Sequence, residues 1–435
     1  MKPLTPPLVI AASFAAAGPG FAADPGVASP MNPDEVRALV ADMLADADTR
    51  SSLLQSGAAA GHDGSFFLAS PDGSFRLNIS GQIQARYTLN FRGDNSGADN
   101  FDSGFTNPRT VLRFDGKIYD KFVYGLQGVF NRSGGGFTLE DAFAGYTFDN
   151  GLVLLAGQYR EPILWEDVLN DKYSLAADQS VVNAIFAQGF SQGAWAFYQA
   201  DTWRFWVGVN DGIRSANTDL GAPGPGTDPA DIGVTTRWEY KLAGAWSQFD
   251  RFSSPRGSDF AVKLGGGVHY EVSPHVPGPL PPAGFGTIET NTLAYTGDVM
   301  MEGDGWNLFA MGVGLYSDGN GPAPSTSDFG LMIQGGLFVT DNIEPFVRWS
   351  AIIPDDSRTG SSVFNTLTFG SNYYIHGQAA KFTIDVQYFL DSVSSNGLVA
   401  ATATGAPGTA TTRIGLLPTA NQGEVAVRFQ FQLLF

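Results

Sequence analysis

Few residues of this chain are of the types that carry enzyme chemistry. Cysteine is absent from the 435 residues, which excludes disulfides, thiolate metal sites and cysteine nucleophiles. Four histidines lie far apart, without the spacing of metal ligands: His62, His269, His275 and His376. His269 stands close to Glu271, and an isolated pair of this kind is more often a contact at a rim than a catalytic pair. We therefore expect no catalysis, no metal site and no cofactor.

The charged residues suggest another kind of chemistry, the orientation of dissolved solutes. One segment, 161–188, lies between two predicted strands and carries a net charge of −5 + 1 = −4. Its charged side chains are Glu161, Glu166, Asp167, Asp171, Asp178 and Lys172. An acidic loop that faces basic residues across a pore would orient dipolar solutes. The alternative is that these acids are ordinary solvated charges at the surface.

The elements that would position such side chains are β-strands. From Phe75 to Phe91, apolar and polar residues alternate without a break, so one face of this strand is apolar and the other polar. Segments 109–119, 379–390 and 424–435 alternate in a similar way. The polar faces of these four strands supply the residues that we expect to line a pore: Arg76, Gln82, Gln84, Arg86, Arg113, Asp115, Lys117, Lys381, Asp385 and Arg428.

Sixteen strands are expected in all. They lie near 74–91, 109–119, 121–131, 136–148, 151–160, 189–200, 202–211, 231–242, 259–271, 288–301, 305–317, 327–339, 343–352, 362–375, 379–390 and 424–435. Short turns such as Asp149-Asn150 alternate with long loops such as 161–188. This rhythm is typical of an even-stranded transmembrane barrel with both termini at the short-turn rim. Two connectors depart from it, since 133–135 is short on the long-loop side and 244–258 is long on the short-turn side.

The composition agrees with a chain whose outer surface faces lipid. Charged residues make up 16% of it, against roughly 25% in soluble domains. No internal segment reaches the ~18 uninterrupted apolar residues of a membrane helix, and no blade signature of a soluble propeller repeats. The net charge of −18 argues against nucleic acid as a partner. We predict an all-β fold over 65–435, a transmembrane antiparallel β-barrel with short periplasmic turns and long extracellular loops.

The N-terminal region carries signals of its own. The apolar run 8–18 follows Lys2 and is typical of a secretory signal peptide, here residues 1–23, although a disordered Ala/Pro tail is the alternative. Residues 24–64 then hold a spacer and one short amphipathic α-helix, about 33–55. This helix would act as a plug, in self-association or in contact with the cell wall. The alternative is a loosely docked extension without a defined role.

The last strand, 424–435, ends on an aromatic residue. It is similar to the terminal strand of bacterial outer-membrane barrels, whose final Phe is read by the barrel assembly machinery. We therefore expect Phe435 to be an assembly signal. We also expect this strand to pair with strand 74–91 and so to close the barrel.

Several short motifs resemble the phosphate-selective porin O and P family, in its opening strand, its second hairpin and the strand that leads into its inward loop. They are Gly73-Ser74-Phe75-Arg76-Leu77, Gln84-Ala85-Arg86-Tyr87, Leu112-Arg113-Phe114-Asp115-Gly116 with Tyr119-Asp120-Lys121-Phe122, and Gly157-Gln158-Tyr159-Arg160-Glu161-Pro162. The resemblance implies a sixteen-stranded channel in outer-membrane lipid, usually a homotrimer, through which small hydrophilic solutes or ions diffuse. It covers about residues 70–435, and the N-terminal helix is not part of the family's pattern.

Phosphate selectivity is not carried over from the resemblance, because phosphate needs a cationic path and loop 161–188 is acidic. We expect this loop to constrict the channel and to give weak cation preference or little selectivity. The alternative function is a structural outer-membrane anchor that links membrane and cell wall through the N-terminal helix. A third alternative is an outer-membrane hydrolase.

Overall fold

The computed structural model describes residues 59–93, 100–131, 134–218, 230–273, 290–319, 324–403 and 423–435. The chain divides into two units, Met1–Gly57 and Ala58–Phe435, and the described residues all belong to the second. The expected signal peptide (1–23) and N-terminal helix (33–55) lie outside the described residues. None of the helices in the described part is long and apolar enough to cross a membrane.

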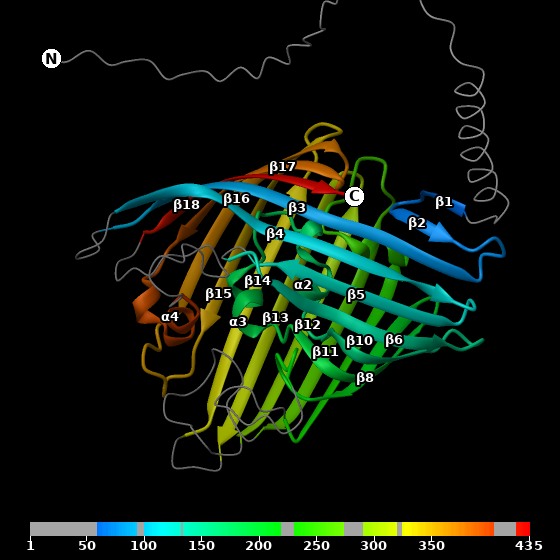
Figure 1. Cartoon of the computed structure of the whole chain (residues 1–435). Coiled ribbons are helices and arrows are strands. Elements are labelled where there is room, and N and C mark those ends of the chain that lie inside the picture. Colours follow the sequence, from blue (N-terminus) through cyan, green and yellow to red (C-terminus); the bar gives the residue numbers. More distant parts are fainter. Residues whose placement is uncertain are drawn as a thin grey trace, which may run out of the picture. The chain divides into compact units, whose positions relative to one another are not determined.

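The described residues form eighteen strands in one antiparallel sheet (Figure 1). Their bounds are β1 Ala59–His62, β2 Phe66–Ala69, β3 Phe75–Phe91, β4 Phe101–Ile118, β5 Phe122–Phe130, β6 Phe137–Thr147, β7 Val153–Arg160, β8 Phe190–Gln199, β9 Trp203–Asn210, β10 Ile232–Ala243, β11 Ala261–Ser273, β12 Thr290–Gly303, β13 Trp306–Gly319, β14 Thr326–Leu337, β15 Ile343–Ile353, β16 Phe364–His376, β17 Ala380–Phe389 and β18 Val425–Leu434. Strands β3 to β18 pair in sequence order, and β18 pairs back onto β3, for example Phe429 opposite Tyr87. This closure confirms the barrel of sixteen strands and the expected pairing of its first and last strands.

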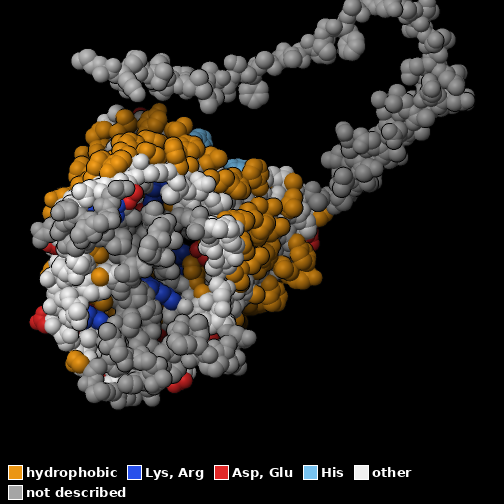
Figure 2. Space-filling model, turned by 60° about the vertical axis from the view of Figure 1, so that its left-hand side comes forward, with side chains coloured by type: hydrophobic (Ala, Val, Ile, Leu, Met, Phe, Trp, Pro, Cys, Tyr) orange, Lys and Arg blue, Asp and Glu red, His pale blue; other side chains and the backbone are white. Residues whose placement is uncertain are grey.

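The two faces of the barrel wall differ as the alternating pattern predicts. On β18, Phe431 and Leu433 are 41% and 42% exposed, whereas Arg428 and Gln430 are buried on the other face. Figure 2 shows hydrophobic side chains gathered over the outer wall and charged side chains where the molecule is hollowed. An outward apolar face suits contact with lipid tails, and an inward polar face suits a lumen.

Two elements differ from the sequence-based expectation. Strand β4 begins at Phe101. Residues 101–106, where a loop was expected, pair with residues 86–91 of β3. The region 24–64, expected to hold only a spacer and a helix, ends in strand β1, since β1 and β2 form a hairpin whose second strand pairs with Arg76–Ile79 of β3. This hairpin occupies the stretch of β3 just before the stretch that pairs with β18, which begins at Gln82.

The C-terminal residue, Phe435, packs against a glycine of β3, Gly81. The backbone N–H of Phe435 donates to the carbonyl of Gly81 at 3.1 Å, and the N–H of Gly81 donates to the carbonyl of Phe435 at 2.7 Å. A Cβ atom at position 81 would stand 2.3 Å from the Phe435 ring. Glycine at 81 therefore permits the closing strand to bring its last ring against β3.

Three segments fold into the space inside the barrel. They contain α2 Trp165–Val168, η1 Asp171–Tyr173 and α3 Val181–Phe186 from one loop, η2 Trp246–Asp250 from the connector 244–258, and η3 Val393–Ser395 with α4 Gly397–Ala403. Their apolar residues, such as Val182, Phe249 and Val399, join inward residues of the wall, such as Phe309, in one buried cluster. Figure 1 shows α2 and α3 inside the ring of strands. The barrel therefore has an apolar core over part of its cross-section.

We expect Gly81→Val to impair closure of the barrel, because its side chain would overlap the Phe435 ring. Heat-modifiable migration in gels and protease resistance of membrane-inserted protein measure this closure. Gly297→Ala is the matched control, since a Cβ there meets no atom within 4 Å. Normal closure of the Gly81→Val protein would show that the contact with Phe435 is dispensable.

Candidate functional site

Loop 161–188 enters the barrel and is held there by buried ionic contacts. Asp178 is the centre of these contacts. Its carboxylate accepts hydrogen bonds from Arg86 of β3 at 2.7 and 2.8 Å, from Arg428 of β18 at 3.0 Å and from Arg109 of β4 at 3.3 Å. Three guanidiniums on adjacent strands thus share one carboxylate of the loop.

The electrostatics of Asp178 follow from this arrangement. Burial by itself would raise the pKa of the carboxyl, but Arg86, Arg428 and Arg109 outweigh it and hold the pKa well below its ordinary value. Asp178 therefore stays ionised in the loop. Arg428 has a second partner, Asp385 of β17, at 2.6 and 2.9 Å.

Backbone groups of the loop bind the same wall. The carboxylate of Asp385 accepts the Ala177 N–H at 2.8 Å, and Lys381 donates to the carbonyl of Ser174 at 2.9 Å. Arg348 of β15 donates to the carbonyl of Asp178 at 2.8 Å. The loop is therefore fixed to strands β15, β17, β18, β3 and β4 through both its side chains and its backbone.

Trp165 of α2 anchors the loop to the opposite part of the wall. Its ring lies against three cations, with the Lys263 ammonium 3.2 Å, the Arg204 guanidinium 4.9 Å and the Arg237 guanidinium 5.2 Å from its ring centroid. Glu239 of β10 forms ion pairs with all three cations. Cation–π contacts of buried groups contribute about 2 kcal/mol or more each, so this cluster is a second fixed point for the loop.

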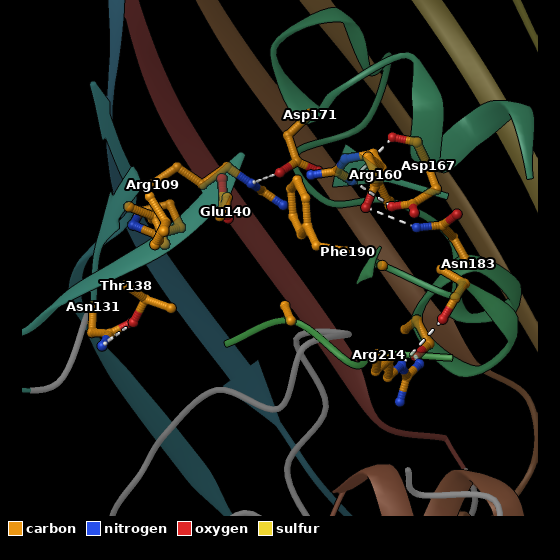
Figure 3. Close-up of a pocket in the computed structure, with 18 of the residues that line it drawn as sticks. Arg109, Asn131, Thr138, Glu140, Arg160, Asp167, Asp171, Asn183, Phe190 and Arg214 are labelled. Carbon is orange, nitrogen blue, oxygen red and sulfur yellow. Dashed lines mark hydrogen bonds and ion pairs between the residues drawn. The ribbon is translucent and has the colours of Figure 1, made fainter. Parts of the chain in front are cut away.

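Two cavities lie between the loop and strands β4 to β7, and we call them together the passage. A cavity of ≈ 480 Å³ lies between α3 and this wall (Figure 3), and a smaller one of ≈ 210 Å³ also borders on Arg160. The polar and charged residues around the two cavities include Arg109, Arg113, Gln127, Asn131, Thr138, Glu140, Asp141, Arg160, Asp167, Asn170, Asp171, Asp178, Gln179, Asn183, Arg214 and Asn217. The narrow part of the passage is therefore lined by charges of both signs.

Most of these charges form pairs across or along the passage. Arg109 binds Asp171, and Arg160 binds Asp167 while its guanidinium lies 4.3 Å from the centroid of the Phe190 ring. Figure 3 shows Arg109 and Asp171, which come from the wall and the loop, pointing toward each other. Basic residues of the wall and acidic residues of the loop thus face one another at these two pairs.

The other proposed pore-lining and loop residues are distributed along the inner wall. Gln84 donates to Gln432 at 2.8 Å and accepts from Arg109 at 3.0 Å, and Gln82 is buried on the same strand. Arg113 binds Asp115 at 3.0 Å and Asp141 at 2.7 Å.

Arg76 and Lys117 lie toward the short-turn end of the barrel. Arg76 lies over the Phe67 ring of the added hairpin, and Lys117 pairs with Asp120 in the turn after β4. Both residues thus make local contacts at this end.

Within the loop, Glu161, Glu166 and Lys172 have separate surroundings. Glu166 accepts the Ser180 N–H at 2.8 Å at the start of α3, and its carboxylate lies 3.6 Å from Arg348. Lys172 lies 5.1 Å from the centroid of the Tyr173 ring. Glu161 is fully buried where the loop leaves β7, and burial raises its pKa to about 7. Glu166 thus joins the loop to β15, whereas Asp167 and Asp171 border on the passage.

The expected rim contact of His269 is wrong, because the imidazole is buried inside the barrel. Its Nδ1 lies 2.7 Å from the Thr235 hydroxyl and its Nε2 lies 3.1 Å from the Glu271 carboxylate. The imidazole thus contacts a hydroxyl with one nitrogen and a carboxylate with the other, an arrangement that is also found in hydrolases. All three side chains are at most 1% exposed, so a substrate could not reach the hydroxyl. Among the described residues, no three potential ligand side chains are grouped to hold a metal ion.

Comparison with known proteins agrees with this geometry. The sequence model of the family "Phosphate-selective porin O and P" matches residues 77–228. The chain is similar to phosphate-selective porins O and P. This match confirms the resemblance, and with the closed barrel it places the protein in the bacterial outer membrane as a porin-type channel. No curated protein matches the chain.

Solved structures share the fold of this porin-like chain at low sequence identity. The anion-selective porin from Comamonas acidovorans has a TM-score of 0.56 at 11% identity, over 82% of this chain and 99% of that one. The trimer form of OmpT from Vibrio cholerae has a TM-score of 0.53 at 11% identity, over 83% and 100%. The channel DcaP of Acinetobacter baumannii has a TM-score of 0.51 at 12% identity, over 83% and 98%.

We expect Asp178→Asn to shift the channel toward anions, because it removes the carboxylate that three arginines share. Loss of one partner of a buried pair costs about 3–5 kcal/mol, so the loop should also loosen. The reversal potential in a KCl gradient measures the selectivity. Asp201→Asn is the matched control, in an exposed turn outside the barrel. An unchanged reversal potential for Asp178→Asn would contradict this role.

Proposed function

We propose that the protein is a passive diffusion channel whose open path is the passage along β4 to β7. The observation that supports this best is the position of loop 161–188. Asp178 fixes it at the β18–β3 seam and Trp165 fixes it near β10 and β11, while Arg160 borders on two cavities between the loop and β4 to β7. The family match and the fold point to a channel rather than to an enzyme. Small hydrophilic solutes or ions would cross by diffusion.

Selectivity follows from the charges that remain unbalanced. The arginines nearest to Asp178 are neutralised by Asp178 and Asp171 of the loop together with Asp385 of β17, so they do not offer a free anion site. The five acids around the passage are Glu140, Asp141, Asp167, Asp171 and Asp178, and the four arginines are Arg109, Arg113, Arg160 and Arg214, which gives −5 + 4 = −1. We propose weak cation preference or little selectivity for this chain.

We further propose that the protein is a homotrimer. The trimer form of a solved barrel with the same fold supports this proposal. Large apolar side chains on the outer wall, such as Trp238 at 55% exposed, supply the surface that lipid and neighbouring copies would cover. Recognition of Phe435 by the barrel assembly machinery remains a prediction, and so does a cell-wall contact of the N-terminal region.

Planar-bilayer recording of the purified full-length protein tests the channel. We expect stepwise openings with a conductance well below that of an unobstructed sixteen-stranded barrel, because the loop fills part of the cross-section. In a KCl gradient, the reversal potential should be small and on the cation-selective side.

A strongly anion-selective reversal potential would contradict the proposed charge balance. Absence of openings from correctly folded protein would contradict the channel itself and favour the anchor function.

A further inference from the structure

Glu140 differs from the other acids of the passage because it has no ion-pair partner among the described residues. Its carboxylate accepts one hydrogen bond, from the Gln127 amide at 2.8 Å. Asp141, Asp167, Asp171 and Asp178 each pair with an arginine. Glu140 is therefore the acid of the passage whose charge is not balanced by an ion pair of the described residues.

A β-bulge brings Glu140 into this position. Gln127 of β5 stands opposite Asp141, and the next residue, Gly128, stands opposite Leu139. Glu140 is thus the extra residue of β6, and a bulge of this kind turns a side chain away from its regular direction. Figure 3 shows Glu140 among the side chains around the cavity.

The same passage holds several buried oxygens that lack hydrogen-bond donors. They are Asp141 Oδ1, Asp167 Oδ2, Asp171 Oδ1 and Asn183 Oδ1. The residues Asp141, Asp167 and Asn183 are at least 94% buried. No buried donor atom of the described lining residues lacks an acceptor. The excess is therefore of acceptors alone, and unpaired buried acceptors favour a ligand that brings N–H or O–H groups.

We propose that the cavity beside Glu140 is a transient binding site for small solutes that carry a primary ammonium group. An ammonium supplies the positive charge that Glu140 has no partner for, and three N–H donors for acceptors such as Asp167, Asp171 and Asn183, which line the same cavity. The cavity of ≈ 480 Å³ has room for a small organic ammonium ion. Binding must be weak enough for the solute to leave, which is the requirement for conduction. This inference rests on the proposed channel function and names a solute class for it.

Transient block of single-channel current tests the site, with the full-length protein in a planar bilayer and KCl as electrolyte. Three probes separate charge from hydrogen bonding. They are butylammonium, which has a charge and donors, tetramethylammonium, which has the charge alone, and butyrate, which is anionic. We expect butylammonium to block at the lowest concentration, tetramethylammonium to block more weakly and butyrate to block least.

Glu140→Gln should raise the half-blocking concentration of butylammonium about tenfold, the ratio expected for one charge-assisted hydrogen bond. Thr138→Asp adds a carboxylate to the same cavity and should lower that concentration. Asp201→Asn, in an exposed turn, should leave it unchanged.

Equal block by butyrate and butylammonium would overturn the ammonium site, and so would a Glu140→Gln protein that is blocked like the parent. Both results leave the channel itself intact. Absence of any openings would instead refute the proposed function and the site with it.

Discussion

The position of loop 161–188 depends on one carboxylate that is shared by three arginines. Arg86, Arg109 and Arg428 come from adjacent strands, and without Asp178 their charges would repel one another on an inner wall poor in water. Asp178 and Asp171 of the loop and Asp385 of β17 offset these three charges, and removal of one partner from a buried ionic cluster costs about 3–5 kcal/mol. Because β18 and β3 meet beside these arginines, the same contact joins the closing seam of the barrel to the loop.

This contact, together with two others, explains why the passage lies to one side of the barrel interior. Trp165 fixes the loop on the β10–β11 side, Asp178 fixes it at the seam, and α3 packs against β14 and β15 between them. The connector 244–258 adds Phe249 and Phe252 to the same buried cluster. What stays open is the wall of β4 to β7, where ion pairs line the cavities instead of apolar side chains. Similarity to anion-selective porins thus does not determine the ion selectivity of this chain, because carboxylates of the loop inside the barrel pair with the arginines of the wall.

The sequence alone was enough to predict the barrel but not the details of its interior. Strict alternation, as in Phe75–Phe91, reports which face is buried, so strand positions and closure followed from it. The partners of Arg86 and Arg428 could not follow, because loop 161–188 obeys no period that relates Asp178 to a strand. Glu140 was not among the expected pore-lining residues, because strand 136–148 was predicted without an assignment of its two faces. The adjacent acids Glu140-Asp141 interrupt the pattern at the bulge and were the available signal. The β1–β2 hairpin was missed because its four-residue strands are too short to show a period.

In the proposed channel, solutes pass along β4 to β7 and not through the middle of the barrel. The chain has no cysteine, so single cysteines can be placed on either side of the loop and modified with a charged thiol reagent during bilayer recording. Thr138→Cys lines the cavity, whereas Thr368→Cys faces inward on β16 and is 1% exposed. The account predicts that the reagent changes the current through the Thr138→Cys channel promptly and leaves the Thr368→Cys channel unaffected. Equal and rapid modification of both would contradict it.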